Sequence, residues 1–115
     1  MTNQTVLVVD DDEAVRLVAK EMLITLGCEV VCAGSGVEAL QKVQERDFDL
    51  IFLDVGMPTM SGTDVYRELR QTDAQQKVVF ITGYAEDDLS DYLGERTSIV
   101  TKPFSIDALS EALTR

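Results

Sequence analysis

Residues 6–13 read VLVVDDDE, four branched apolar residues followed at once by four acidic ones. An unbroken apolar run of this kind, rich in β-branched residues, is typical of a strand buried on both faces. The stretches LIFL at 50–53 and VVFI at 78–81 repeat the pattern. Weaker runs at 30–33 and 98–101 predict two further strands. Together they indicate a parallel sheet covered by helices.

Stretches with helical periodicity lie between the expected strands. Val15, Val18, Met22 and Leu26 fall on one face of the first helix, and Gly27 follows as its stop signal. Later helices are expected from Val37, Leu40 and Val43, from Val65, Tyr66 and Leu69, and from Ile106, Leu109 and Leu113 after the cap Ser105.

The segment 85–93 is short and acidic, but the alternation of strand and helix requires a helix there. Its acidic side chains form either a solvated face or a docking surface for a basic partner. A strand–helix unit repeated five times predicts an open parallel sheet with helices on both faces. No linker divides the 115 residues, which are too few for two domains. We therefore expect one α/β domain over residues 1–115.

Charge and composition exclude several classes of function. Ten Lys and Arg against 21 Asp and Glu give a net charge of −11, which argues against direct binding to nucleic acid or to an anionic membrane. The sequence has no histidine, which excludes Ser-His-Asp and Cys-His catalysis, His-bound zinc and a phosphohistidine carrier. Carboxylate, hydroxyl and lysine chemistry remain.

The two cysteines and the short apolar runs bear on location. Cys28 and Cys32, if extended, lie about 13 Å apart, too far for a disulfide. We interpret them as reduced, partly buried thiols, which favours a cytoplasmic protein. The longest apolar runs have four residues, so no membrane-spanning segment is expected. No signal peptide is expected either.

Candidate site residues follow the expected strands, because ligands bind beyond the carboxyl ends of open parallel sheets. Asp54 follows the third strand, Thr82 the fourth and Lys102 the fifth. Converging carboxylates repel one another unless a cation such as Mg²⁺, which prefers oxygen ligands, neutralises them. A hydroxyl and an ammonium can contact phosphoryl oxygens. This combination predicts phosphoryl transfer onto an aspartate.

The spacing assigns roles to the carboxylates. Asp54 ends a buried strand and precedes the uncharged loop VGMP, so it is the candidate nucleophile. Asp10 and Asp11 leave the neighbouring strand together and can hold the metal. Asp12 and Glu13 are expected at the start of the first helix, where negative side chains favour the helix dipole.

Four motifs, taken in order, resemble the receiver domain of two-component response regulators of the chemotaxis-regulator type. They are VLVVDDDE at 6–13, FLDVGMP at 52–58, ITGYA at 81–85 and TKPF at 101–104. The resemblance covers essentially the whole chain. It implies a flavodoxin-like (βα)5 fold with strand order 2-1-3-4-5, and a phosphorylation switch rather than an enzyme.

The resemblance also implies the chemistry of the carboxylates. Asp54 matches the aspartate that accepts a phosphoryl group from the phosphohistidine of a histidine kinase or phosphotransfer protein. Asp10 and Asp11 match the acidic pair that binds Mg²⁺, or Mn²⁺ in its place. Asp54 itself and the backbone carbonyl of Gly56 complete the expected ligands.

The remaining matched residues belong to the switch. Thr82 matches the hydroxyl that moves to bond the phosphoryl group, and Lys102 matches the lysine that contacts it. The Lys102–Pro103 peptide bond is usually cis in the family. Phosphorylation is expected to repack the face formed by the segment 85–93, the fifth strand and the last helix, which a downstream effector or fused output domain reads. A stand-alone regulator and a receiver from a longer protein, such as a hybrid kinase, both fit.

Some positions depart from the family pattern. Ile99 stands three residues before the lysine, where receivers commonly carry an aromatic residue, and Tyr84 is a conjectural substitute. Gly56 leaves the position two after Asp54 without a side chain, which predicts unusual water access and phosphoryl lifetime. No specific dimer is expected.

Two other functions compete with the phosphorylation switch. Asp10 and Asp12 fit the Asp-x-Asp motif of a HAD-type phosphatase, but Ala14 stands where Thr or Val is usual and no later acidic pair follows the lysine. A receiver-like interaction module that takes no phosphate would have lost the acceptor, an acid or the lysine, and all are present. The stretch GSG at 34–36 is interpreted as the turn into the second helix rather than a phosphate loop.

Overall fold

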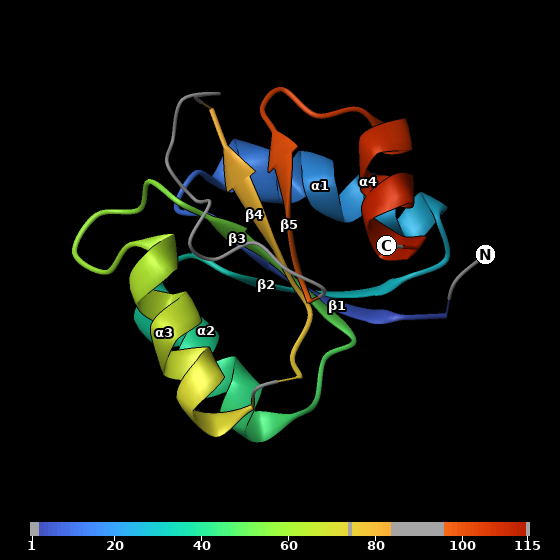
Figure 1. Ribbon diagram of the computed structural model, residues 1–115. Coiled ribbons are helices and arrows are strands. Elements are labelled where there is room, and N and C mark those ends of the chain that lie inside the picture. Colours follow the sequence, from blue (N-terminus) through green and yellow to red (C-terminus); the bar gives the residue numbers. More distant parts are fainter. Residues whose placement is uncertain (1–2, 74, 84–95, 115) are drawn as a thin grey trace.

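The computed structural model describes residues 3–73, 75–83 and 96–114, which contain a five-stranded parallel sheet. Its strands run in the order β2-β1-β3-β4-β5 (Figure 1). They are β1 (Thr5–Val9), β2 (Glu29–Ala33), β3 (Leu50–Asp54), β4 (Val78–Thr82) and β5 (Thr97–Thr101). All five predicted strands and the predicted strand order are confirmed.

Helices cover both faces of the sheet, as the alternating pattern predicted. The described helices are α1 (Glu13–Thr25), α2 (Gly36–Glu45), α3 (Gly62–Thr72) and α4 (Ile106–Thr114). One face packs against α1 and α4 and the other against α2 and α3 (Figure 1). The helix expected at 85–93, with its acidic side chains, and Tyr84 lie outside the described residues.

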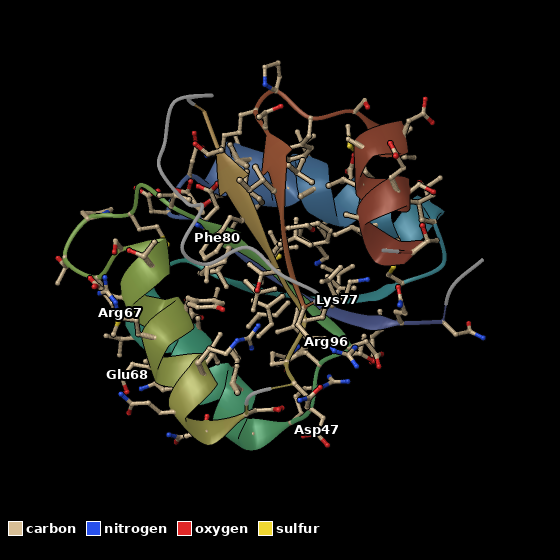
Figure 2. The ribbon with its side chains drawn as sticks, in the orientation of Figure 1. Asp47, Arg67, Glu68, Lys77, Phe80 and Arg96 are labelled. Carbon is tan, nitrogen blue, oxygen red and sulfur yellow. The ribbon has the colours of Figure 1, made fainter. Side chains whose placement is uncertain are left out.

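Two core layers explain the unbroken apolar runs. Val6 and Val8 of β1 pack toward α1 and α4, whereas Leu7 and Val9 pack toward α2 and α3. Successive side chains of a strand point to opposite faces, so a strand covered on both faces needs apolar residues throughout. On the α3 side, Phe80 of β4 fills the layer (Figure 2) and lies against a tyrosine ring of α3. The edge strand β2 is only partly buried, which explains its weaker sequence signal.

Polar side chains start three of the helices where the sequence predicted. Asp12 accepts a hydrogen bond from the Ala14 amide at the start of α1. Ser35 caps α2, so the GSG stretch makes the turn into that helix, and Ser105 accepts a bond from an amide of α4. Gly27 has a φ of 93° after α1, a conformation that favours glycine.

The predicted buried face of two helices was wrong at one residue each. Val18 of α1 is 48% exposed and Val37 of α2 is 58% exposed. The buried positions are instead Ala19 and Leu23 in α1 and Ala39 in α2. Ala19 and Ala39 belong to the core layers on the two faces of the sheet, whereas the valines lie outside these layers. The predicted faces omitted Ala19, Leu23 and Ala39 and so misplaced the centre of each face.

Both cysteines are free, with Cys28 buried and Cys32 partly buried, as the sequence predicted. Burial raises the pKa of the Cys32 thiol. Over the residues that the structure describes, every helix is too short or too polar to cross a membrane.

Candidate functional site

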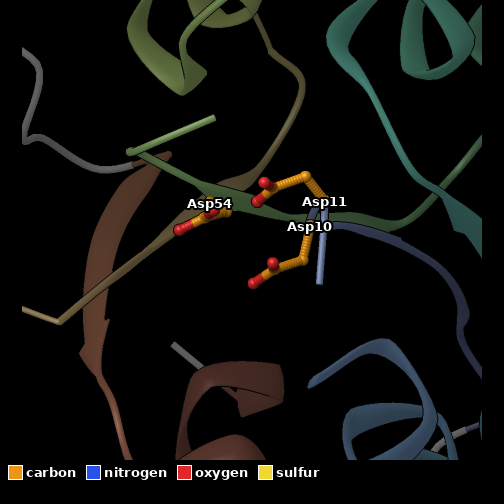
Figure 3. A group of neighbouring side chains, drawn as sticks. All are labelled: Asp10, Asp11 and Asp54. Atoms are coloured by element: carbon orange, nitrogen blue, oxygen red, sulfur yellow. The ribbon is translucent and has the colours of Figure 1, made fainter. Parts of the chain in front are cut away.

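Three carboxylates converge at the carboxyl ends of two neighbouring strands. Val9 pairs with Leu53 in the parallel register of β1 and β3, so the residues that follow, Asp10 and Asp54, lie side by side at the same edge of the sheet. Together with Asp11 they point toward one another (Figure 3), with one carboxylate oxygen from each lying within 4.8 Å of the others. Sequence reasoning predicted this grouping from the position of the residues after each strand.

Burial differs among the three carboxylates. Asp10 is fully buried, Asp54 is 6% exposed, and Asp11 lies at the surface. Asp54 stands at the end of a strand that is buried throughout. The cluster is therefore reached from solvent on the Asp11 side.

Lys102 is the cation that faces this cluster. Its ammonium lies 2.9 Å from Asp10 Oδ2 and 3.2 Å from Asp54 Oδ1. A hydrogen bond holds its backbone directly after β5. Its amide donates to the carbonyl of Thr82 at 2.7 Å, and the Lys102–Pro103 peptide bond is cis, as the resemblance implied.

The electrostatics of the cluster favour a further positive charge. Burial, followed by the charge of Asp10, raises the pKa of Asp54, and these effects outweigh Lys102 and the amide of Gly56, which lower it. Burial lowers the pKa of Lys102, but its hydrogen bond to Asp10 and the charge of Asp54 outweigh burial and raise it overall. One ammonium thus faces three carboxylates, which leaves an excess of negative charge.

The donor set fits a hard divalent cation. All three side chains offer carboxylate oxygens, the ligands that Mg²⁺ prefers. The exposed position of Asp11 leaves room for water on an ion. Asp12 lines the same pocket but accepts a hydrogen bond from the Ala14 amide at the start of α1, and it is not a member of the cluster of Asp10, Asp11 and Asp54.

The predicted hydroxyl and glycine border the same pocket. Thr82, the last residue of β4, is 3% exposed, and it lines a pocket of about 580 Å³ with Gly56, Lys102 and the three carboxylates. A Cβ at Gly56 would meet open space, so this glycine leaves the pocket wider than a larger residue would. Ile99 is partly buried and packs against the core layer on the α2 and α3 side.

Sequence reasoning missed Gly62, the first residue of α3. A Cβ there would overlap the backbone carbonyl of Asp54 and crowd the Cα of Val55. The Gly62 amide also donates to the Val55 carbonyl at 3.1 Å. Gly62 therefore lets α3 start directly against the peptide that carries Asp54. The pattern Ser61-x-x-Asp64, which forms a capping box at this point, is the signal that could have located the helix start.

The sequence is similar to known signalling proteins over nearly its whole length. Residues 6–114 match the family model of the response regulator receiver domain. The chemotaxis protein CheY of Bacillus subtilis is 32% identical over 114 residues, which cover 96% of this chain and 94% of CheY. The sensor kinase CckA of Brucella abortus is 40% identical over 110 residues, 92% of this chain but 12% of the kinase.

Solved structures share the fold. The response regulator TrrA of Thermotoga maritima, crystallised in complex with Mg²⁺-BeF, is 35% identical and superposes with a TM-score of 0.86 over 96% of each chain. A structure of TrrA in complex with the histidine kinase ThkA also matches, with a TM-score of 0.84, 34% identity and 96% coverage of both chains.

Proposed function

The chain belongs to the response regulator receiver domain family, and on that premise we propose that it accepts a phosphoryl group on Asp54. The family is a phosphoacceptor switch of two-component signalling rather than a classical enzyme. One observation carries the proposal: the Asp54 carboxylate lies 3.2 Å from the Lys102 ammonium and within 4.8 Å of the carboxylates of Asp10 and Asp11. A nucleophile, a phosphoryl contact and candidate metal ligands thus share one pocket.

The phosphoryl donor is the phosphohistidine of a histidine kinase or phosphotransfer protein. A carboxylate oxygen of Asp54 forms a bond to phosphorus while the phosphorus–nitrogen bond breaks, and the electron pair stays on the imidazole nitrogen. The Lys102 ammonium and the Thr82 hydroxyl contact the transferred phosphoryl oxygens. The structures of TrrA with ThkA and with Mg²⁺-BeF support the same kinds of partner and ion for this chain.

The metal site is formed by Asp10, Asp11, Asp54 and the carbonyl of Gly56, holding Mg²⁺ or Mn²⁺. When bound, the ion supplies positive charge that offsets the negative charge of the phosphoryl oxygens. The excess of carboxylates over ammonium in the pocket supports this assignment.

Phosphorylation changes the surface that a partner reads. Thr82 ends β4 and Lys102 directly follows β5, the adjacent strand, so their movement toward the phosphoryl group would displace both strand ends. An effector or a fused output domain then responds to the altered face around β5 and α4. The proposal places this switching in the cytoplasm, without direct contact to nucleic acid or membrane.

The test is the intact mass of the chain after incubation with acetyl phosphate and Mg²⁺. The native chain should gain one phosphoryl group, and the gain should disappear with a chelator or with Asp54→Asn. Asp47→Asn, at an exposed position outside the pocket, is the matched control and should still be modified. A native chain that stays unmodified at every Mg²⁺ concentration would be an interaction module, and an adduct on Asp54→Asn would exclude Asp54 as the acceptor.

A further inference from the structure

The backbone carbonyl of Asp10 lies between two regular elements. The β1 strand ends at Val9, and the first carbonyl that α1 uses is that of Asp12, which accepts from the Arg16 amide at 3.1 Å. Asp10 is fully buried, and a buried carbonyl needs a hydrogen-bond donor. Arg16 provides it, because Nη1 of its guanidinium donates to the Asp10 carbonyl at 2.7 Å.

The turn after β2 leaves room for the Arg16 guanidinium. The guanidinium lies over Gly34, where a Cβ would be 3.2 Å from Arg16 Nη1. The Gly34 amide in turn donates to Glu38 Oε1 of α2 at 2.7 Å. Glycine therefore leaves the room that the guanidinium occupies, and Glu38 holds this turn in place.

Hydrogen bonds at three atoms of Asp10 therefore fix its position. Its amide donates to the Ala33 carbonyl at 3.2 Å, its carbonyl accepts from Arg16, and its Oδ1 accepts from the Asp12 amide at 2.9 Å. The second carboxylate oxygen, Oδ2, is left to face Lys102 and the cluster.

We propose that Arg16 is a positioning residue for the metal site, acting through the Asp10 backbone. This inference rests on the proposed function, in which Asp10 and Asp11 bind Mg²⁺. The Asp10 carbonyl belongs to the peptide that joins these two residues, so fixing it fixes the direction in which both carboxylates leave the strand. Hydrogen-bond partners that orient metal ligands change affinity without touching the ion.

A positioning role and a purely electrostatic role of Arg16 predict opposite changes in Mg²⁺ affinity when Arg16 is replaced. A guanidinium near the pocket repels a cation, so if Arg16 acted only through its charge, its removal would tighten Mg²⁺ binding. If Arg16 positions Asp10 and Asp11, its removal weakens Mg²⁺ binding. The sign of the change therefore separates the two roles.

The test is a Mg²⁺ titration of the full chain, monitored through its backbone amide NMR signals. It needs no phosphoryl donor. Arg16→Met should raise the dissociation constant for Mg²⁺ about tenfold, and Arg16→Lys, which keeps a donor, should recover part of the loss. Gly34→Ala keeps the charge but crowds the guanidinium, so it should weaken binding in the same direction. Lys20→Met removes a charge one turn along α1 at an exposed position and should not weaken binding.

A second readout is the Mg²⁺ dependence of modification by acetyl phosphate. Arg16→Met should raise the Mg²⁺ concentration for half-maximal rate and keep the rate at saturating Mg²⁺. The inference is overturned if Arg16→Met binds Mg²⁺ as tightly as the native chain or more tightly, or if Lys20→Met weakens binding equally. A native chain that binds no Mg²⁺ would overturn the proposed metal site as well, which distinguishes the two failures.

Discussion

The charged side chains at the two ends of the sheet have different kinds of partner. At the carboxyl ends of the strands, the ammonium of Lys102 faces the buried carboxylates of Asp10 and Asp54. Near the amino ends of β4 and β5, where Lys77 and Arg96 lie (Figure 2), Arg70 of α3 donates hydrogen bonds to neutral groups. Its guanidinium donates to the Gln76 carbonyl at 2.7 Å, the Thr97 hydroxyl at 3.1 Å and the Tyr66 hydroxyl at 3.0 Å.

This contrast separates structural from functional polar groups. The Arg70 guanidinium also lies 4.7 Å from the centre of the Tyr66 ring, so its charge is shared among carbonyl, hydroxyl and aromatic partners within the chain. At the other end, negative charge exceeds positive charge. A bound cation would neutralise part of this negative charge. Without the cation, repulsion among the carboxylates lowers the stability of the folded chain, so this end is built for binding at a cost in stability.

Removing the ammonium at the carboxyl end should have the largest effect. Lys102→Met eliminates a positive charge 3.2 Å from Asp54, and loss of one such contact lowers transfer rates by about 10²-fold. The rate of mass gain with acetyl phosphate at saturating Mg²⁺ measures it. Lys77→Met, at the opposite end, should change the rate little, and equal losses in both variants would contradict the distinction between the two ends.

Removing the guanidinium near the amino ends should affect stability instead. Arg70→Met leaves the Gln76 carbonyl and the Thr97 hydroxyl without this donor, and we expect a loss of about 2 to 3 kcal/mol in the free energy of unfolding. Phosphorylation of the folded variant should continue. Arg67→Met, on the same helix in an exposed pair with Asp64, is the control and should cost less than about 1 kcal/mol. Urea unfolding measures both.

Neutralising a carboxylate of the site should stabilise the chain when no divalent cation is present. In Asp54→Asn the amide no longer repels Asp10 and can still accept a bond from Lys102. The expected gain is about 1 kcal/mol in the free energy of unfolding, measured by urea unfolding with a chelator. Saturating Mg²⁺ should remove this advantage because the ion stabilises only the native cluster. A variant less stable than the native chain under chelation would contradict the excess of negative charge.

The smallest expected effect is the pH dependence of the stability difference between Asp54→Asn and the native chain. The pKa of Asp54 is raised above its ordinary value of 3.8, so the folded chain holds this proton more tightly than the unfolded chain. The native chain's stability relative to Asp54→Asn should therefore fall as pH rises from about 3.8 through the folded pKa, and level off above it. Unfolding of both proteins across this range, without divalent cations, measures the difference. If the stability advantage of Asp54→Asn narrowed with rising pH, the pKa of Asp54 would be lowered in the folded chain rather than raised.

Much of this architecture could be predicted because its signals are local. Strands covered on both faces need continuous apolar runs, and parallel strands bring the residues after them to one edge, so Asp10, Asp54 and Lys102 were expected to meet. The buried faces of α1 and α2 were harder to predict, since Ala19 and Ala39 form the contact with the sheet and carry little hydrophobic signal.

The supporting residues were not predictable from the sequence pattern. Gly62 matters because the Asp54 backbone approaches α3 closely, and Arg16 because its long side chain reaches back to Asp10. Arg70 likewise connects α3 with groups far along the chain, such as Thr97. Each contact depends on how separate elements pack, which neither periodicity nor spacing encodes.

The most direct test locates the phosphoryl group on the chain. The chain is treated with acetyl phosphate and Mg²⁺, reduced with borohydride, which converts an aspartyl phosphate to homoserine, and analysed by peptide mass spectrometry. Conversion at residue 54 alone, dependent on Mg²⁺, is the predicted result. Conversion at Asp10 or Asp11, or a phosphoryl group that resists reduction on a serine or threonine, would contradict the assignment of Asp54 as the acceptor.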